Sequence, residues 1–198
     1  DEALRQDPKL TDAFYNRGNT HFAQKQYSAA IKDYDEVIKQ TPKSTKAYYH
    51  RGEAYTSLGQ FEKAIQDFNQ AQKLNPKGQE IYSSRGLAQR RLGNHELAVK
   101  DYSEAIKLNS KDAEAYNNRG NAYSLLGKYD QALKDYDEAV KLDPKNARIY
   151  GNRGMVKLRQ GKAEEAQQDF KKAIELEPSL KGKLEPLMNE QKTPAAQR

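Results

Sequence analysis

Apolar and small residues recur along this chain with a period of 34 positions, and the period organises nearly every other feature. An arginine-glycine dipeptide marks it five times, at Arg17-Gly18, Arg51-Gly52, Arg85-Gly86, Arg119-Gly120 and Arg153-Gly154. Relative to each glycine, an aromatic stands four positions before, an alanine twelve after, a second aromatic sixteen after and a small residue nineteen after. This regularity predicts five copies of one structural repeat.

The spacing inside a repeat predicts two helices. Tyr116, Gly120 and Tyr123 share one face of a first helix. Gly127 follows, as glycine does in the left-handed position after a helix. A second helical stripe of alanines and an aromatic then runs to Pro144, which stops it. Neither helix can bury its stripe alone, so we expect neighbouring repeats to stack and share a core.

The expected fold is all-α, a right-handed superhelical solenoid of stacked antiparallel helix pairs. The expected repeats span residues 11–44, 45–78, 79–112, 113–146 and 147–180. Residues 1–10 align with the end of a second helix, so we interpret them as the C-terminal end of a preceding partial repeat in a chain that begins further upstream. Residues 181–198 are expected to form a capping helix, interrupted at Gly182 and Pro186, and then a disordered tail.

These aromatic, glycine, tyrosine, alanine and proline positions resemble the signature of the tetratricopeptide repeat family over about residues 11–180. The resemblance implies a protein–protein interaction scaffold or adaptor, in which the first helices line a concave groove that binds an extended peptide or a partner's helix. Gln89 and Lys157 depart from the family's inner tyrosine, and Lys25 from its turn glycine. We expect these three departures to loosen the array locally.

Composition and charge limit the possible fold classes and the possible site chemistry. A mean hydropathy of −1.10 with 31% charged residues suits either disorder or a thin elongated fold, and thirteen tyrosines in register favour the fold. No apolar run approaches the ~18 residues of a membrane helix, and no signal-peptide pattern is present. The absence of cysteine excludes disulfides and thiolate metal sites.

The net charge of +6 raises the question of nucleic-acid binding. Each arginine before a repeat glycine is matched by an aspartate just before the second aromatic. These aspartates are Asp33, Asp67, Asp101, Asp135 and Asp169. Because a guanidinium binds a carboxylate with two parallel hydrogen bonds, we predict five structural ion pairs. A phosphate-binding arginine stripe is the disfavoured alternative, and RNA binding remains a weak one.

The resemblance also implies where a ligand would lie. An asparagine two positions before the glycine offers a donor and an acceptor to any peptide bond, although a plain solvated helix face would also tolerate it. The candidate groove residues are Tyr15, Asn16, Asn19, Tyr49, His50, Leu87, Arg91, Asn117, Asn118, Asn121, Asn152 and Met155. The same inward face also carries Asp12, Lys46 and Glu53.

No constellation for catalysis emerges, and we predict neither an enzyme, a metal site nor a cofactor. The three histidines, His21, His50 and His95, occupy three different points of the repeat. Acids such as Asp137 are interpreted as solvation or as part of the arginine–aspartate ladder. The expected partner is a protein or peptide. The alternative function is self-assembly, in which the chain stacks through its ends or convex face into a homo-oligomer.

Overall fold

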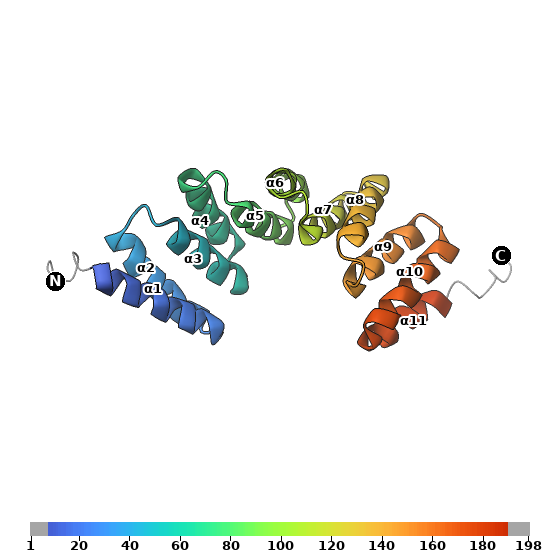
Figure 1. The fold of residues 1–198 in the computed structure, drawn as a ribbon, viewed down its shortest axis with the longest axis horizontal. Coiled ribbons are helices and arrows are strands. Elements are labelled where there is room, and N and C mark those ends of the chain that lie inside the picture. Colours follow the sequence, from blue (N-terminus) through green and yellow to red (C-terminus); the bar gives the residue numbers. More distant parts are fainter. Residues whose placement is uncertain (1–7, 190–198) are drawn as a thin grey trace. The chain divides into compact units, whose positions relative to one another are not determined.

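The computed structural model describes residues 8–189, and this part of the chain is built from helices without a strand (Figure 1). The helices are α1 Pro8–Ala23, α2 Tyr27–Gln40, α3 Thr45–Ser57, α4 Phe61–Leu74, α5 Gln79–Arg91, α6 His95–Leu108, α7 Ala113–Leu125, α8 Tyr129–Leu142, α9 Ala147–Arg159, α10 Ala163–Leu176 and α11 Lys181–Asn189, with a 3-10 turn at Pro178–Leu180. The predicted all-α architecture of paired helices is confirmed.

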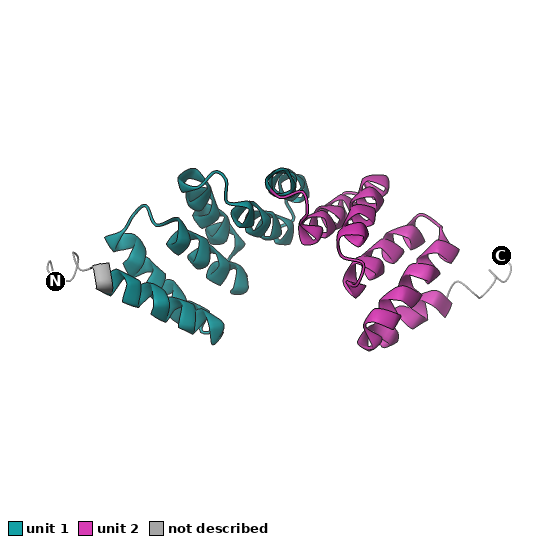
Figure 2. Ribbon diagram, viewed as in Figure 1, with its two compact units in different colours: residues 1–108 teal, residues 109–198 magenta. Residues whose placement is uncertain are grey.

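The chain divides into two compact units (Figure 2). Unit 1, residues 1–108, contains three helix pairs, α1–α2, α3–α4 and α5–α6, and each pair packs on the next through α2–α3 and α4–α5. Unit 2, residues 109–198, contains the pairs α7–α8 and α9–α10, joined through α8–α9, and α11 packs on α10. Among the described residues, no helix is long and apolar enough to span a membrane.

The glycine of each arginine-glycine dipeptide lies against the second aromatic of its own repeat. A Cβ atom added to Gly120 would lie 2.8 Å from a ring carbon of Tyr136. The same close approach joins Gly18 to Tyr34, Gly52 to Phe68, Gly86 to Tyr102 and Gly154 to Phe170. These rings are almost completely buried. The aromatic-glycine spacing therefore exists because the ring occupies the space that a side chain at the glycine position would need.

The turn between the two helices of a pair ends in a left-handed residue. Gly127 adopts φ of 70°, and Lys25 adopts φ of 60° at the same repeat position. A side chain in this conformation costs about 1 kcal/mol or more relative to glycine. The turn after α1 therefore keeps its geometry at the expense of local strain.

The two ends differ from the internal repeats. α1 begins at Pro8, three residues before the position that the start of α3 at Thr45 would indicate, so residues 8–10 belong to α1 and not to a preceding repeat. Residues 1–7 of that predicted partial repeat lie outside the described residues, as does the predicted tail at 190–198. α11 buries Leu184, which is 4% exposed, in a cluster with Phe170 and Ala173.

Candidate functional site

The five predicted arginine–aspartate pairs form a ladder, with one pair in each repeat. Each ladder arginine lies against the aspartate of its own repeat. Arg51 Nε donates to Asp67 Oδ2 at 2.8 Å, and its Nη2 donates to Oδ1 at 2.7 Å. The same pairing joins Arg17 to Asp33, Arg85 to Asp101, Arg119 to Asp135 and Arg153 to Asp169. The five aspartates are only 4–5% exposed. The pairs therefore lie at the interface between the two helices of each repeat.

The third guanidinium nitrogen reaches back to the preceding repeat, a contact for which the sequence suggested only Asp137 as a possible member of the ladder. Nη1 donates from Arg51 to Asp35 at 2.6 Å, from Arg85 to Asn69 at 2.7 Å and from Arg153 to Asp137 at 2.8 Å. Each acceptor stands two residues after the ladder position of the preceding second helix. The recurrence of a polar residue at this position is the sequence feature that could have predicted this contact.

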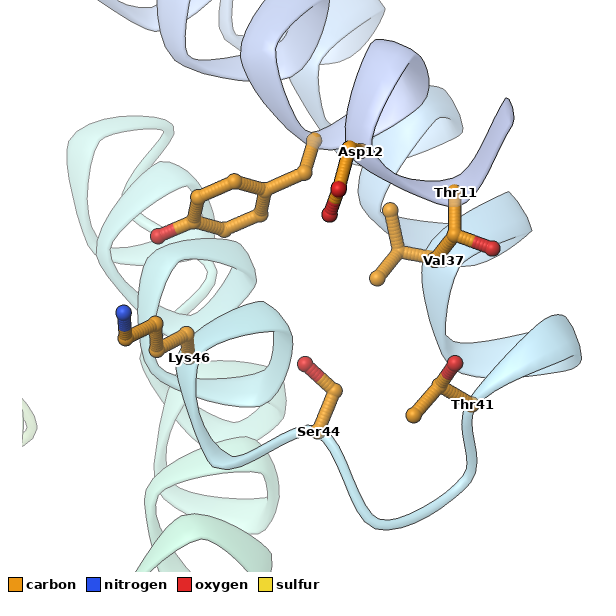
Figure 3. A pocket seen from close by; sticks show the side chains of 7 residues that line it. Thr11, Asp12, Val37, Thr41, Ser44 and Lys46 are labelled. Carbon is orange, nitrogen blue, oxygen red and sulfur yellow. The ribbon is translucent and has the colours of Figure 1, made fainter. Parts of the chain in front are cut away.

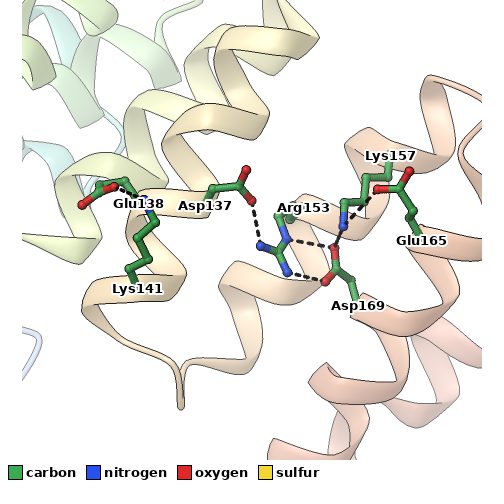
Figure 4. A network of polar contacts seen from close by, with 7 residues as sticks. All are labelled: Asp137, Glu138, Lys141, Arg153, Lys157, Glu165 and Asp169. Carbon is green, nitrogen blue, oxygen red and sulfur yellow. Dashed lines mark hydrogen bonds and ion pairs between the residues drawn. The ribbon is translucent and has the colours of Figure 1, made fainter.

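Lys157 extends the ladder at the end of unit 2 (Figure 4). Its Nζ lies 2.9 Å from Asp169 Oδ2 and 3.7 Å from Glu165 Oε2, so Asp169 contacts two cations, Arg153 and Lys157. Gln89, the other departure from the inner tyrosine, accepts a hydrogen bond from Asn94 Nδ2 at 2.9 Å. Gln89 and Lys157, which replace the inner tyrosine of the repeat, therefore both have polar partners.

Burial opposes these ion pairs. Burial lowers the pKa of Arg51, but the hydrogen bonds and charges of Asp67 and Asp35 together outweigh it, so the pKa rises overall. For Asp67 the balance is reversed, because burial, with a smaller contribution from the charge of Asp35, raises the pKa of its carboxyl more than Arg51 lowers it. A buried ion pair gains little over an apolar pair, but losing one partner leaves a buried charge unpaired. We therefore interpret the ladder as a set of contacts that fix the alignment of neighbouring helices.

The first helices of unit 1 bring four candidate residues together. Tyr15 of α1 lies 5.8 Å from His50 of α3, and His50 lies 5.1 Å from Tyr49, measured between ring centroids. All three side chains are half-buried. Asn19 of α1 joins them through Tyr34, whose ring stacks on His50 at 6.0 Å. The result is an aromatic surface that runs from α1 to α3.

Hydrogen bonds tie this surface to α5. The Tyr49 hydroxyl donates to Glu53 Oε1 at 2.9 Å, and His50 Nδ1 lies 2.9 Å from Glu53 Oε2. Since the single hydroxyl proton of Tyr49 goes to Glu53, the contact of 3.3 Å between Tyr49 Oη and Ser84 Oγ requires Ser84 of α5 to donate. The first-helix face of unit 1 is therefore organised by polar contacts as well as by packing.

The residue directly after the repeat glycine has one of two roles in four repeats, and the third repeat, with Leu87 opposite Tyr102, fits neither. Asn19 Oδ1 accepts from the buried Tyr34 hydroxyl at 2.8 Å, and Asn121 Oδ1 accepts from Tyr136 in the same way. Where the second aromatic is a phenylalanine, no hydroxyl needs an acceptor, and the residue after the glycine is Glu53 or Met155. The two asparagines therefore support the core with their oxygens.

In unit 2 the candidate asparagines bind to one another. Asn152 Nδ2 of α9 donates to Asn117 Oδ1 of α7 at 3.0 Å, so each is partly occupied within the chain. Asn118 is half-buried on the same helix as Asn117. Met155 packs against the core cluster around Phe170 and Leu184, which removes much of its surface from the helix face.

The remaining candidates, Asn16, Leu87 and Arg91, lie on first helices of unit 1. Asn16 and Arg91 are exposed, and Leu87 is half-buried. An open pocket of about 270 Å³ lies beside Tyr15 (Figure 3). Its lining comes from α1, α2, α3 and the turn between the last two, and consists of Thr11, Asp12, Tyr15, Val37, Thr41, Ser44 and Lys46. Asp12 and Lys46 give it one charge of each sign.

Tetratricopeptide repeat models match residues 45–77, 113–146 and 147–180, and a second repeat model matches 18–59 and 90–127. No curated protein sequence matches the chain. Among the described residues, no cluster of three or more histidine, aspartate or glutamate side chains could hold a metal ion.

Solved structures show the same fold. A crystal structure of MamA is 27% identical with a TM-score of 0.76, over 82% of this chain and 95% of MamA. MamA of Desulfovibrio magneticus RS-1 is 22% identical with a TM-score of 0.80, over 85% and 96%. YrrB, described as a TPR protein with an unusual peptide-binding site, is 22% identical with a TM-score of 0.73, over 89% and 91%. With its two helices per repeat and these matches, the chain belongs to the tetratricopeptide repeat family.

Proposed function

We propose that this chain, a protein-interaction scaffold of the tetratricopeptide repeat family, binds an extended peptide on the first-helix faces of its units. The observation that carries the proposal is the first-helix surface of unit 1. There, Tyr15 of α1 packs against His50 of α3, and Tyr49 of α3 is hydrogen-bonded to Ser84 of α5, while these side chains stay half-exposed. Such a surface is organised before a ligand arrives, which lowers the entropy lost on binding.

The chemistry of the faces suits a peptide backbone. Amide and hydroxyl groups at Asn16, Ser84 and Asn118 offer both donors and acceptors, which pair with peptide N–H and C=O groups of any sequence. Half-buried Tyr15 and Tyr49 add apolar contact area of the kind that dominates protein interfaces. YrrB, which shares the fold, is described as having an unusual peptide-binding site, and this supports the choice of ligand class.

The experiment is selection of peptides from a random library against the full chain, followed by affinity measurement on variants. Asn16→Arg in unit 1 and Asn118→Arg in unit 2 place a bulky cation on the proposed faces. Gln66→Arg on α4 and Gln131→Arg on α8 add the same side chain to exposed positions of second helices. The proposal requires weaker binding in at least one of the first pair and unchanged binding in both controls. Equal affinity in all four variants would refute it.

Self-assembly is the second candidate, and exposed leucines favour it. Leu58, Leu92 and Leu97 of unit 1 are each more than a third exposed, near the turns within the helix pairs. Analytical ultracentrifugation over a concentration series tests this reading. A species of 22.6 kDa at every concentration would dismiss it. RNA binding finds less support, because the ladder arginines already contact acidic or amide side chains within the chain.

A further inference from the structure

Glu53 is held in place on the first-helix face of unit 1 and still reaches solvent. Its two oxygens accept from the Tyr49 hydroxyl and from His50, both at 2.9 Å, and its side chain is 30% exposed. Because the carboxylate accepts, Nδ1 of His50 carries the proton and donates it. A carboxylate fixed by two donors keeps further lone pairs for a third.

No lysine or arginine pairs with Glu53 among residues 8–189. Exposed glutamates on second helices behave differently, since Glu36, Glu104 and Glu138 each pair with a lysine three residues further along. A second acid, Glu80 of α5, adds to the negative field here. Burial raises the pKa of Tyr49, and the charges of Glu53 and Glu80 raise it further.

Aromatic rings frame this carboxylate. Tyr49 lies one turn before Glu53 on α3, and Tyr15 faces the neighbouring His50 across the α1–α3 interface. Ring faces attract cations, and a carboxylate forms charge-assisted hydrogen bonds with ammonium and guanidinium groups. The combination matches a basic side chain with an alkyl stem.

The repeat position of Glu53 is distinctive within the chain. The corresponding residues in the other repeats are Asn19, Leu87, Asn121 and Met155, so the second repeat alone has an acid there. Its second aromatic is Phe68, which has no hydroxyl that would engage the carboxylate from the core side. The acid is therefore free of the core-supporting role that Asn19 performs with Tyr34.

We propose that Glu53, flanked by Tyr15 and Tyr49, binds a lysine or arginine side chain of the peptide held by unit 1. The inference rests on the proposed peptide-binding function and names the residue class that its ligand carries at one position. The pocket beside Tyr15 lies next to this contact and can receive a neighbouring ligand side chain.

The test uses nine-residue acetylated and amidated serine–glycine peptides with Leu-X-Leu at the centre, where X is lysine, arginine, glutamine or glutamate. Each is titrated into the full isotope-labelled chain at pH 8. Amide NMR shifts give affinity and location together. We expect lysine and arginine peptides to bind about tenfold more tightly than the glutamine peptide, and the glutamate peptide most weakly.

Two variants assign the preference to its residue. Glu53→Gln should abolish the difference between the lysine and glutamine peptides. Glu62→Gln, the same change at an exposed position of α4 in the same repeat, should preserve it. A preference that persists in Glu53→Gln, or equal binding of lysine and glutamine peptides with shifts on α1 and α3, overturns this inference and leaves the proposed function standing. If no peptide shifts any first-helix amide, both fail.

Discussion

At the residue scale, the side chain after the repeat glycine follows the ring opposite in four of the five repeats, the exception being Leu87 opposite Tyr102. Tyr34 and Tyr136 bring a buried hydroxyl to the helix interface, and an asparagine at that position accepts from it. Phe68 and Phe170 bring none, and the same position then holds Glu53 or Met155. The sequence displays this covariation openly. Its meaning needed the structure, because only coordinates show which way an asparagine oxygen points.

A double-mutant cycle on Asn19 and Tyr34 tests this coupling. Asn19→Ala and Tyr34→Phe should each lower the free energy of unfolding by about 1 kcal/mol, because each removes the same hydrogen bond. The double variant should lose little more than either one, with a coupling energy of about 1 kcal/mol. Urea denaturation measures all three. Asn16→Ala, at an exposed position, serves as the neutral control, and strictly additive losses would show that the bond contributes nothing.

Lys25 provides a second residue-scale prediction. Lys25→Gly should raise the free energy of unfolding by about 0.5–1 kcal/mol, because the residue adopts a positive φ that glycine tolerates better. Gly127→Lys, the reverse change at the same position of the fourth repeat, should lower it by a similar amount. Both are measured by thermal and urea unfolding. A loss of stability in Lys25→Gly would contradict the assignment of strain to this turn.

At the element scale, the arginine ladder joins both helices of a repeat to the helix before them. The sequence predicted the partner within each repeat, since arginine and aspartate recur in phase. It left open whether Asp137 belongs to the ladder and did not identify the recurring second acceptor at Asp35, Asn69 and Asp137, because that residue varies in type and lies in a different repeat. A polar residue on a helix surface resembles simple solvation until the neighbouring helix is placed.

Removing one ladder partner should be far more harmful than removing both. Arg51→Met leaves Asp67 buried without its partner and should lower the free energy of unfolding by about 3 kcal/mol. The double change Arg51→Met with Asp67→Leu should recover most of that loss. Arg17→Met should lower the free energy of unfolding by only a small fraction of that amount, because the Arg17 side chain is 60% exposed. Equal effects at Arg17 and Arg51, or no recovery in the double variant, would contradict this account of the ladder.

The terminal helix α11 is expected to stabilise the last repeat. Leu184→Ala should lower stability by about 2–3 kcal/mol, because it opens the cluster with Phe170 and Ala173. Hydrogen exchange should show the loss of protection concentrated in α10. The partly buried Leu187→Ala should have a smaller effect at the same amides. Unchanged exchange in α10 would show that α11 does not support the last repeat.

At the scale of the whole molecule, the period of 34 residues was enough to predict the fold. Its glycines, rings and alanines are packing requirements that recur in each repeat. The ligand face was predicted less completely, because the repeat assigns positions to the first helices without saying which side chains the core already engages. Asn121 and Asn152 satisfy partners inside the chain, whereas Glu53 is free of lysine and arginine partners in the described part.

The most direct test of the account is where a peptide contacts the full chain. Amide NMR with the lysine peptide should shift resonances of α1, α3 and α5, centred on Tyr15, Tyr49 and Glu53. The outer positions of α2, α4 and α6 should stay unchanged. Shifts confined to those second helices, or the absence of shifts at millimolar peptide, would contradict the claim that the first helices form the binding face.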